Sequence, residues 1–159
     1  MADSVRGDIA EVADGPEYDL NFRDHPERYR HTAGEQGAFK IEPYKSQLLP
    51  LWTVADLGPA AKAAQTIYDR YREYRAAGDF VGMDMARKYL QMGWTRAMRY
   101  AKYPGGQKYE DGEKREPEQW YDPEKRRIAR IYRFHLDRVR EDSAYQRAIE
   151  AHRERYGED

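Results

Sequence analysis

The sequence predicts a mainly α-helical protein, in which about four helices follow an irregular N-terminal third with at most a short β-hairpin. Three observations support this prediction. Apolar residues recur at helical spacing from about residue 58 onward. Before that point, Pro43 and Pro50 interrupt a stretch that has no helical period. Asp79 and Asp122 stand immediately before helical patterns, where an aspartate can cap a helix.

A chain of 159 residues is long enough to form one domain with a buried core. Residues 1–16 are small, polar and acidic, which predicts a disordered arm. The single helical domain spans residues 17–159, with an irregular segment at residues 17–57 and helices at residues 58–159. Within the irregular segment, residues 38–42 alternate between apolar and polar side chains, which is typical of a short strand.

The first two predicted helices are separated by a glycine stop. Pro59 fits the first turn of a helix that ends at Gly78. The apolar stripe of this helix consists of Ala60, Ala64, Ile67, Tyr71 and Tyr74. Asp79 caps the second helix, which runs to about Lys102, where a Pro-Gly-Gly sequence follows shortly.

The third and fourth helices follow a charged linker. Asp122, Pro123 and Glu124 supply a cap, a first-turn proline and an acid near the positive end of the helix dipole. The fourth helix is predicted to begin at Ser143. The two apolar stripes consist of Ile128, Ile131, Tyr132, His135 and Val139, and of Tyr145, Ala148, Ile149, His152 and Tyr156.

The second helix and the loop after it carry six basic side chains and no acidic one over residues 85–109, although the whole chain has a net charge of −1. Five aromatic residues are interspersed with them: Tyr89, Trp94, Tyr100, Tyr103 and Tyr109. On a helical projection, Lys88, Arg99 and Lys102 lie opposite the apolar arc. Clustered cations beside aromatic rings are typical of a surface that binds phosphates and stacks unpaired bases.

A second basic block covers residues 125–140, and an acidic connector at residues 110–124 separates it from the first. If the two basic blocks lie on the same face, they create a strong positive electrostatic potential there. If the acidic connector folds over them, its carboxylates neutralise that potential. The binding site predicted for nucleic acid or another anion consists of Arg87, Lys88, Arg96, Arg99, Lys102, Tyr103, Lys108, Tyr109, Arg126, Arg130 and Arg133.

Several motifs of the chain resemble those of a known family. They are the run GDFVGMDMARKYLQMG from Gly78 to Gly93, then Thr95-Arg96, Arg99-Tyr100-Ala101, Gly105-Gly106 and Lys108-Tyr109, and upstream GEQG at 34–37 and EPYKS at 42–46. Together they resemble a family of short uncharacterised proteins from bacteria and their phages, catalogued as a domain of unknown function. The resemblance covers about residues 18–152. It implies a small single-domain protein, and it implies no activity, ligand or catalytic residue.

Three functions remain open. The first is non-enzymatic binding of nucleic acid or another polyanion, largely through backbone contacts and therefore with low sequence specificity. The second is a protein-interaction module that uses exposed Tyr, Trp and Arg side chains. The third is an enzyme for a phosphorylated small molecule at Gly105-Gly106, between Lys102 and Lys108. The structural alternative is a solvated helix face followed by a glycine stop.

Composition excludes several other sites. The chain has no cysteine, so it forms neither disulfides nor thiolate zinc sites. His25 and His31 match no known metal-ligand spacing, so we expect no metal and no cofactor. The serines have no nucleophile motif, so a binding protein is a better expectation than an enzyme. With no signal peptide and no long apolar run, we expect a cytoplasmic protein without a membrane partner.

Overall fold

The computed structural model describes residues 20–116 and 121–157. The predicted arm at residues 1–16 lies outside these ranges. Four long helices confirm the mainly helical class, and each begins within two residues of its predicted start. They are α3 (Leu57–Ala76), α4 (Phe80–Lys102), α5 (Pro123–Arg140) and α6 (Ser143–Tyr156). None of the described helices combines the length and apolar character needed to cross a bilayer.

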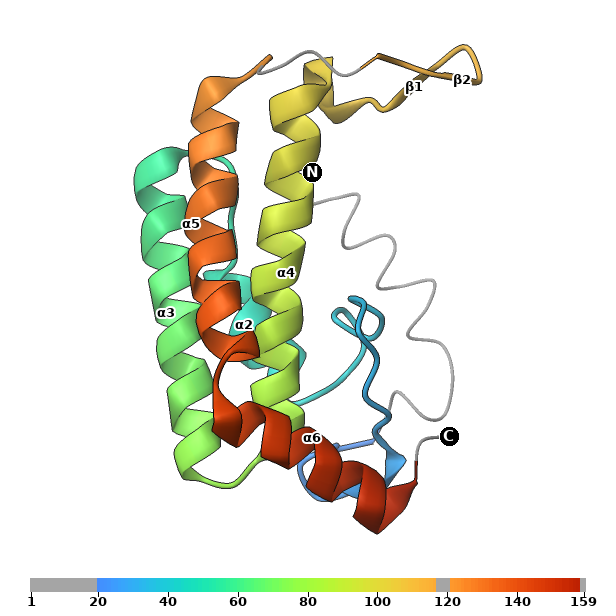
Figure 1. Cartoon of the computed structure of the whole chain (residues 1–159), viewed down its shortest axis with the longest axis vertical. Helices are drawn as coiled ribbons and strands as arrows, with labels where there is room; N and C mark the ends of the chain where they lie inside the picture. The colour runs from blue at the N-terminus through green and yellow to red at the C-terminus, as the bar shows by residue number, and fades with distance from the viewer. Residues whose placement is uncertain (1–19, 117–120, 158–159) are drawn as a thin grey trace.

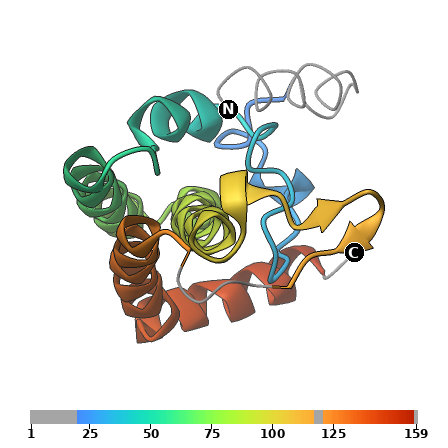
Figure 2. The same cartoon turned by 90° about the horizontal axis from the view of Figure 1, so that it is seen from above.

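The helices α3, α4 and α5 run down, up and down along one another, and each of the three packs against the other two (Figure 1). The helix α6 crosses the end of this bundle where α4 begins and α5 ends (Figure 1). Seen from above, the N-terminal segment and α6 lie around α4 on the sides that α3 and α5 leave open (Figure 2). The second helix is therefore the centre of the molecule, surrounded on several sides.

The two aspartate caps predicted from the sequence are confirmed. The Asp79 carboxylate accepts a hydrogen bond from the Gly82 amide at 3.0 Å, and Asp122 accepts one from the Lys125 amide at 3.1 Å. The last helix is capped by Asp142, whose carboxylate accepts from the Ala144 amide at 2.9 Å. These bonds satisfy amides that have no partner within their own helix.

The N-terminal third contains short helical turns where a strand was expected. These are η2 (Pro26–Arg28), α2 (Tyr44–Leu48) and η3 (Leu49–Leu51). The strand predicted at residues 38–42 is wrong, because residues 36–40 form turns and an isolated bridge joins Asn21 to Glu42. The amides of Lys40 and Ile41 donate to the Gly37 carbonyl, which closes a turn and prevents an extended backbone.

The β-hairpin of the structure lies in the connector between α4 and α5. Its strands β1 (Tyr109–Glu110) and β2 (Glu113–Lys114) pair antiparallel. The two turn residues, Asp111 and Gly112, both have positive φ angles, of 54° and 83°. An Asp-Gly pair tolerates this conformation, which matches the twist of the flanking strands, and it is a sequence signal for a hairpin.

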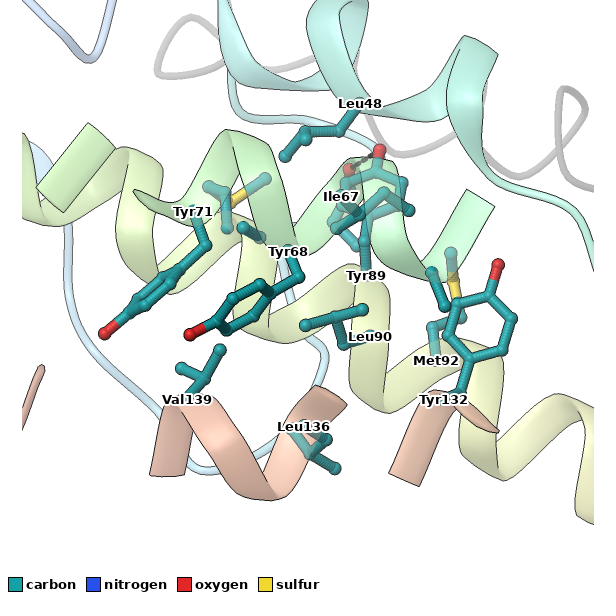
Figure 3. Packing of buried hydrophobic residues seen from close by; sticks show 14 of the residues in the cluster. Leu48, Ile67, Tyr68, Tyr71, Tyr89, Leu90, Met92, Tyr132, Leu136 and Val139 are labelled. Atoms are coloured by element: carbon teal, nitrogen blue, oxygen red, sulfur yellow. Dashed lines mark hydrogen bonds between the residues drawn. The ribbon is translucent and has the colours of Figure 1, made fainter. Parts of the chain in front are cut away.

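Tyrosines carry much of the core (Figure 3), and most of their hydroxyls have hydrogen-bond partners. The Tyr89 hydroxyl donates to the Ala38 carbonyl at 2.6 Å, and the Tyr132 hydroxyl donates to the Thr53 carbonyl at 2.8 Å. A buried hydroxyl without a partner would cost free energy, so these bonds allow large amphipathic rings to fill the interior. They also attach the irregular segment to α4 and α5.

Candidate nucleic-acid interface

A shallow groove between α4 and α5 brings together three of the predicted cations. The two helices are antiparallel, and the Asp122 amide donates to the Ala101 carbonyl at 3.1 Å, which aligns the end of α4 with the start of α5. The groove has a volume of about 380 Å³. It is lined by Trp94 and Met98 of α4 and by Arg126, Arg130, Arg133, Phe134 and Asp137 of α5. We call this feature the α4–α5 groove.

Arg133 joins the two walls of the groove. Its guanidinium lies over the Trp94 ring, 4.5 Å from the ring centroid, and its Nε donates to the Asp137 carboxylate at 2.9 Å. A guanidinium stacked on an indole gains cation–π attraction, and the carboxylate fixes its orientation. Arg133 is thus held flat on the groove wall while almost half of its side chain remains exposed.

Phe134 is the largest exposed apolar feature of α5, at 60% exposure. It lies on the polar side of an amphipathic helix, away from the buried stripe, and sequence reasoning did not select it. The Arg138 guanidinium lies 5.6 Å from the Phe134 ring centroid and 3.8 Å from that of Tyr68. An aromatic residue on the charged arc of α5 was the signal that could have identified it.

The remaining groove cations sit around this aromatic centre. Arg130 is exposed and has no hydrogen bond or ion pair with any residue that the structure describes. Arg126 is half-buried one turn earlier. On α4, Lys102 follows Met98 by one turn on the same side of the helix, so it extends the groove toward the α4 C-terminus. Arg99, exposed, lies further round α4.

Arg96 also lies away from the groove. It is half-buried, and the helical period places it about half a turn round α4 from Met98. The two basic blocks therefore meet along one part of their length: the predicted residues that line or adjoin the groove are Lys102, Arg126, Arg130 and Arg133.

The prediction that Arg87 and Lys88 bind a ligand at the surface, Lys88 from the arc opposite the apolar one, is wrong. Both side chains are buried, at 2% and 1% exposure. The Arg87 guanidinium donates to the carbonyls of Thr32, Ala33 and Gly34, at distances of 2.6–3.2 Å. The N-terminal segment packs against this side of α4 and covers it. Neither cation is available to a ligand on the surface.

These two cations belong to a buried polar cluster centred on Asp84. The carboxylate accepts hydrogen bonds from the hydroxyls of Tyr29 and Tyr145, and His31 Nδ1 lies 3.0 Å from it. Burial alone raises the pKa of Asp84, but the His31 hydrogen bond and the Arg87 charge outweigh burial and hold this pKa well below its usual range. The carboxylate is therefore ionised, and the cluster is a structural anchor.

Burial in the same cluster changes the pKa of Lys88. Its ammonium donates to the Gln36 carbonyl and lies 4.9 Å from the Tyr29 ring centroid. Burial lowers the pKa of Lys88 to about 8, because the nearby Asp84 carboxylate offsets only part of the desolvation of the ammonium.

The loop after α4 supplies one exposed ring and one buried ring. Tyr103 is buried, so the expectation that it stacks on a base is wrong. Tyr109 is 59% exposed on β1, and Lys108 beside it is half-buried. Gly105 and Gly106 form a 3₁₀ turn, η4 (Pro104–Gly106), and line neither the α4–α5 groove nor the cleft beside α6. The loop therefore does not join the groove.

The described part of the acidic connector does not occupy the groove. Glu110 pairs with Arg115 inside the connector, with 3.7 Å between Oε2 and Nε. Glu124 accepts from the Leu57 amide at 3.4 Å, on the side of α3. Residues 117–120 lie outside the described ranges. These contacts leave the field of Arg130 and Arg133 in place rather than cancelling it.

A larger cleft, of about 630 Å³, lies between α6 and the turn that joins α3 to α4. Several of its polar side chains bond one another or the backbone. Arg23 Nε donates to the Asp79 carboxylate at 3.3 Å, and His152 Nε2 lies 2.8 Å from the Tyr29 carbonyl. Arg23, Asp79 and His152 therefore take part in contacts that hold the N-terminal segment against α4 and α6.

The histidines take structural positions. His135 and His152 are buried at the edge of the core, as predicted from their apolar stripes. His25 contacts the carboxylate of Glu27 at 3.2 Å. Within the described residues, no group of three or more histidine or carboxylate side chains is arranged to hold a metal ion.

Comparison with known proteins gives one match. A family model described as a domain of unknown function (DUF4385) matches residues 13–155, which confirms the resemblance seen in the motifs. No curated protein and no solved structure matches the chain. The function therefore has to be argued from the groove itself.

Proposed function

The chain belongs to the DUF4385 family of unknown function, and we propose that it binds polyanions, nucleic acids foremost, at the α4–α5 groove. One observation carries this proposal. Arg126, Arg130 and Arg133 of α5 line a single groove whose other wall is formed by Trp94 and Met98. Arginine forks bind phosphate oxygens, and aromatic walls accommodate bases or sugars.

The proposed contacts are to the nucleic-acid backbone. A short row of arginines on one helix face neutralises phosphates without reading base edges, so affinity depends on salt more than on sequence. The neutral total charge of the chain does not oppose this, because the local field of α5 acts within about 10 Å at ordinary ionic strength. We expect weak to moderate affinity with little sequence preference.

The test is binding of fluorescently labelled DNA and RNA oligonucleotides, followed by anisotropy from 20 to 200 mM salt. In the variant Arg130→Glu we expect roughly tenfold weaker binding and a shallower dependence on salt, because a phosphate contact is lost. The matched control is Arg72→Glu, which makes the same charge change at an exposed position of α3 outside the groove. Failure of the wild-type protein to bind any oligonucleotide at low salt, or equal losses in both variants, overturns the proposal.

A second candidate function is a protein-interaction site at the same groove. It is favoured by the exposed Phe134 ring beside Met98 and Trp94, since aromatic, methionine and arginine side chains are enriched in protein interfaces. The two candidates differ in their salt dependence. Polyanion binding weakens steeply as salt rises, whereas a contact centred on apolar side chains changes little.

A further inference from the structure

We infer that the α4–α5 groove takes an unpaired nucleotide strand in preference to a duplex, an inference that rests on the proposed function. The feature that points to it is an aromatic ring set among cations. Phe134 is 60% exposed, Arg130 precedes it by one helical turn and Arg138 follows it by one turn. The ring lines the groove together with Trp94 and Met98, so it belongs to a contiguous apolar patch, and such exposed patches mark binding sites.

The cations and the ring follow a regular interval. Arg126, Arg130, Phe134 and Arg138 are each four residues apart, which corresponds to steps of about 6 Å along the α5 axis. Positions four residues apart on a helix lie on the same face. The face therefore carries Arg126 and Arg130 before the ring and Arg138 after it, an order that suits phosphates on either side of a stacked base. The Arg138 guanidinium lies 3.8 Å from the Tyr68 ring centroid and 5.6 Å from that of Phe134.

Arg133 provides a second flat surface inside the groove. Trp94 supports one side of its guanidinium and Asp137 holds its edge, so its planar group is already oriented before a ligand arrives. Guanidinium planes stack on unpaired bases as aromatic rings do. Because the geometry is fixed in advance, little side-chain entropy is lost when a base binds.

Asp137 indicates which part of a nucleotide enters the groove. A carboxylate repels phosphate but accepts hydrogen bonds from the amino groups of bases. The centre of the groove thus favours a base, while the phosphates lie toward Arg126, Arg130 and Arg138. A duplex keeps its bases stacked within the helix and cannot place one against Phe134, so the ring contributes only to the binding of an unpaired strand.

The experiment compares one sequence as a single strand and as a duplex, with binding measured by anisotropy at 50 mM salt. We expect the wild-type protein to prefer the single strand. Phe134→Ala should weaken single-strand binding roughly tenfold, the loss typical of one stacked base, and leave duplex binding within about twofold. The matched control is Tyr121→Ala, which removes a ring that is 51% exposed and does not line the groove. Thermal unfolding confirms that both variants are folded.

The outcomes separate this inference from the function on which it rests. If the wild-type protein binds neither form, the proposed function itself fails. If it binds both forms equally and Phe134→Ala changes neither, polyanion binding stands and the preference for an unpaired strand is overturned. Equal losses for the two forms in Phe134→Ala, or an equal loss in Tyr121→Ala, also overturn it, because stacking in the groove predicts neither result.

Discussion

Arg87 and Asp84 form an ion pair at 2.9 Å on the buried side of α4, one helical turn apart. The pair lies beneath the N-terminal segment, whose backbone carbonyls accept the other guanidinium hydrogens. Two of the six cations of the basic segment, Arg87 and Lys88, are thus used to hold the fold together. The exposed cations lie further along α4 and on α5.

The buried pair predicts a large effect on stability. Arg87→Met removes the guanidinium and leaves the Asp84 carboxylate buried without its main counter-charge. We expect the free energy of unfolding to fall by about 3–5 kcal/mol. Urea denaturation measures it, with Arg99→Met as the control, because Arg99 is exposed on the same helix and its loss should change stability by less than about 0.5 kcal/mol. Similar values for both variants would contradict the structural role of Arg87.

Acid should destabilise the fold through Asp84. The folded pKa of this carboxyl lies below its unfolded value of about 3.9, so its contribution to stability is present above that pH and is lost as pH falls toward the folded pKa. Urea unfolding from pH 7 to pH 2.5 measures the loss. Asp84→Asn should be less stable at pH 7 and should lose less below pH 4. An unchanged slope in that variant would show that other carboxyls cause the acid sensitivity.

Lys88 predicts that stability also rises with pH in the alkaline range. Its pKa is lowered to about 8 in the folded protein, against an ordinary value of 10.5, so the unfolded chain binds the proton more tightly. The contribution of Lys88 to stability therefore rises with pH between these values, by about 2 kcal/mol from pH 8 to pH 10. The stability difference between the wild-type protein and Lys88→Met isolates this effect from tyrosine ionisation. A difference that stays constant with pH would mean that the ammonium is not desolvated.

Close packing of α4 against α5 predicts an effect at Gly93. A Cβ atom there would lie 2.2–2.4 Å from atoms of the Tyr132 ring. Gly93→Ala should therefore push the helices apart and cost about 1–3 kcal/mol of stability. Gly58→Ala is the control, because a Cβ atom at this position in the first turn of α3 meets nothing within 4 Å, and the change should be neutral or slightly stabilising. Equal effects at both positions would argue against the close approach.

Much of the helical fold could be predicted because its signals are local. Asp79 and Asp122 mark helix starts through bonds to amides three residues away. The apolar stripe of α5, including Tyr132 and Val139, is the side that is buried. The hairpin position was missed although Asp111-Gly112 is a turn signal, because the flanking residues are polar and show no strand pattern.

Part of the candidate site could also be predicted, because the signals for its exposed arginines are local. Arg126, Arg130 and Arg133 lie on the polar arc of α5, and local periodicity places them on the surface. Phe134 was missed because a single aromatic residue within a charged arc leaves no periodic signal. Arg87 and Lys88 were misplaced because the segment that covers them comes from residues about fifty positions earlier in the chain.

The amino-acid sequence alone determined where the helices begin and end and which side of each carries the apolar stripe, since caps and helical periods act between residues within a few positions of one another. Tertiary structure alone decided which cations reach solvent. The carbonyls of residues 32–36 bond Arg87 and Lys88 and bury them, while the pairing of α4 with α5 leaves Arg130 exposed. Both outcomes depend on the packing of segments that are distant in the chain, and the apolar periodicity of a single helix does not predict that packing.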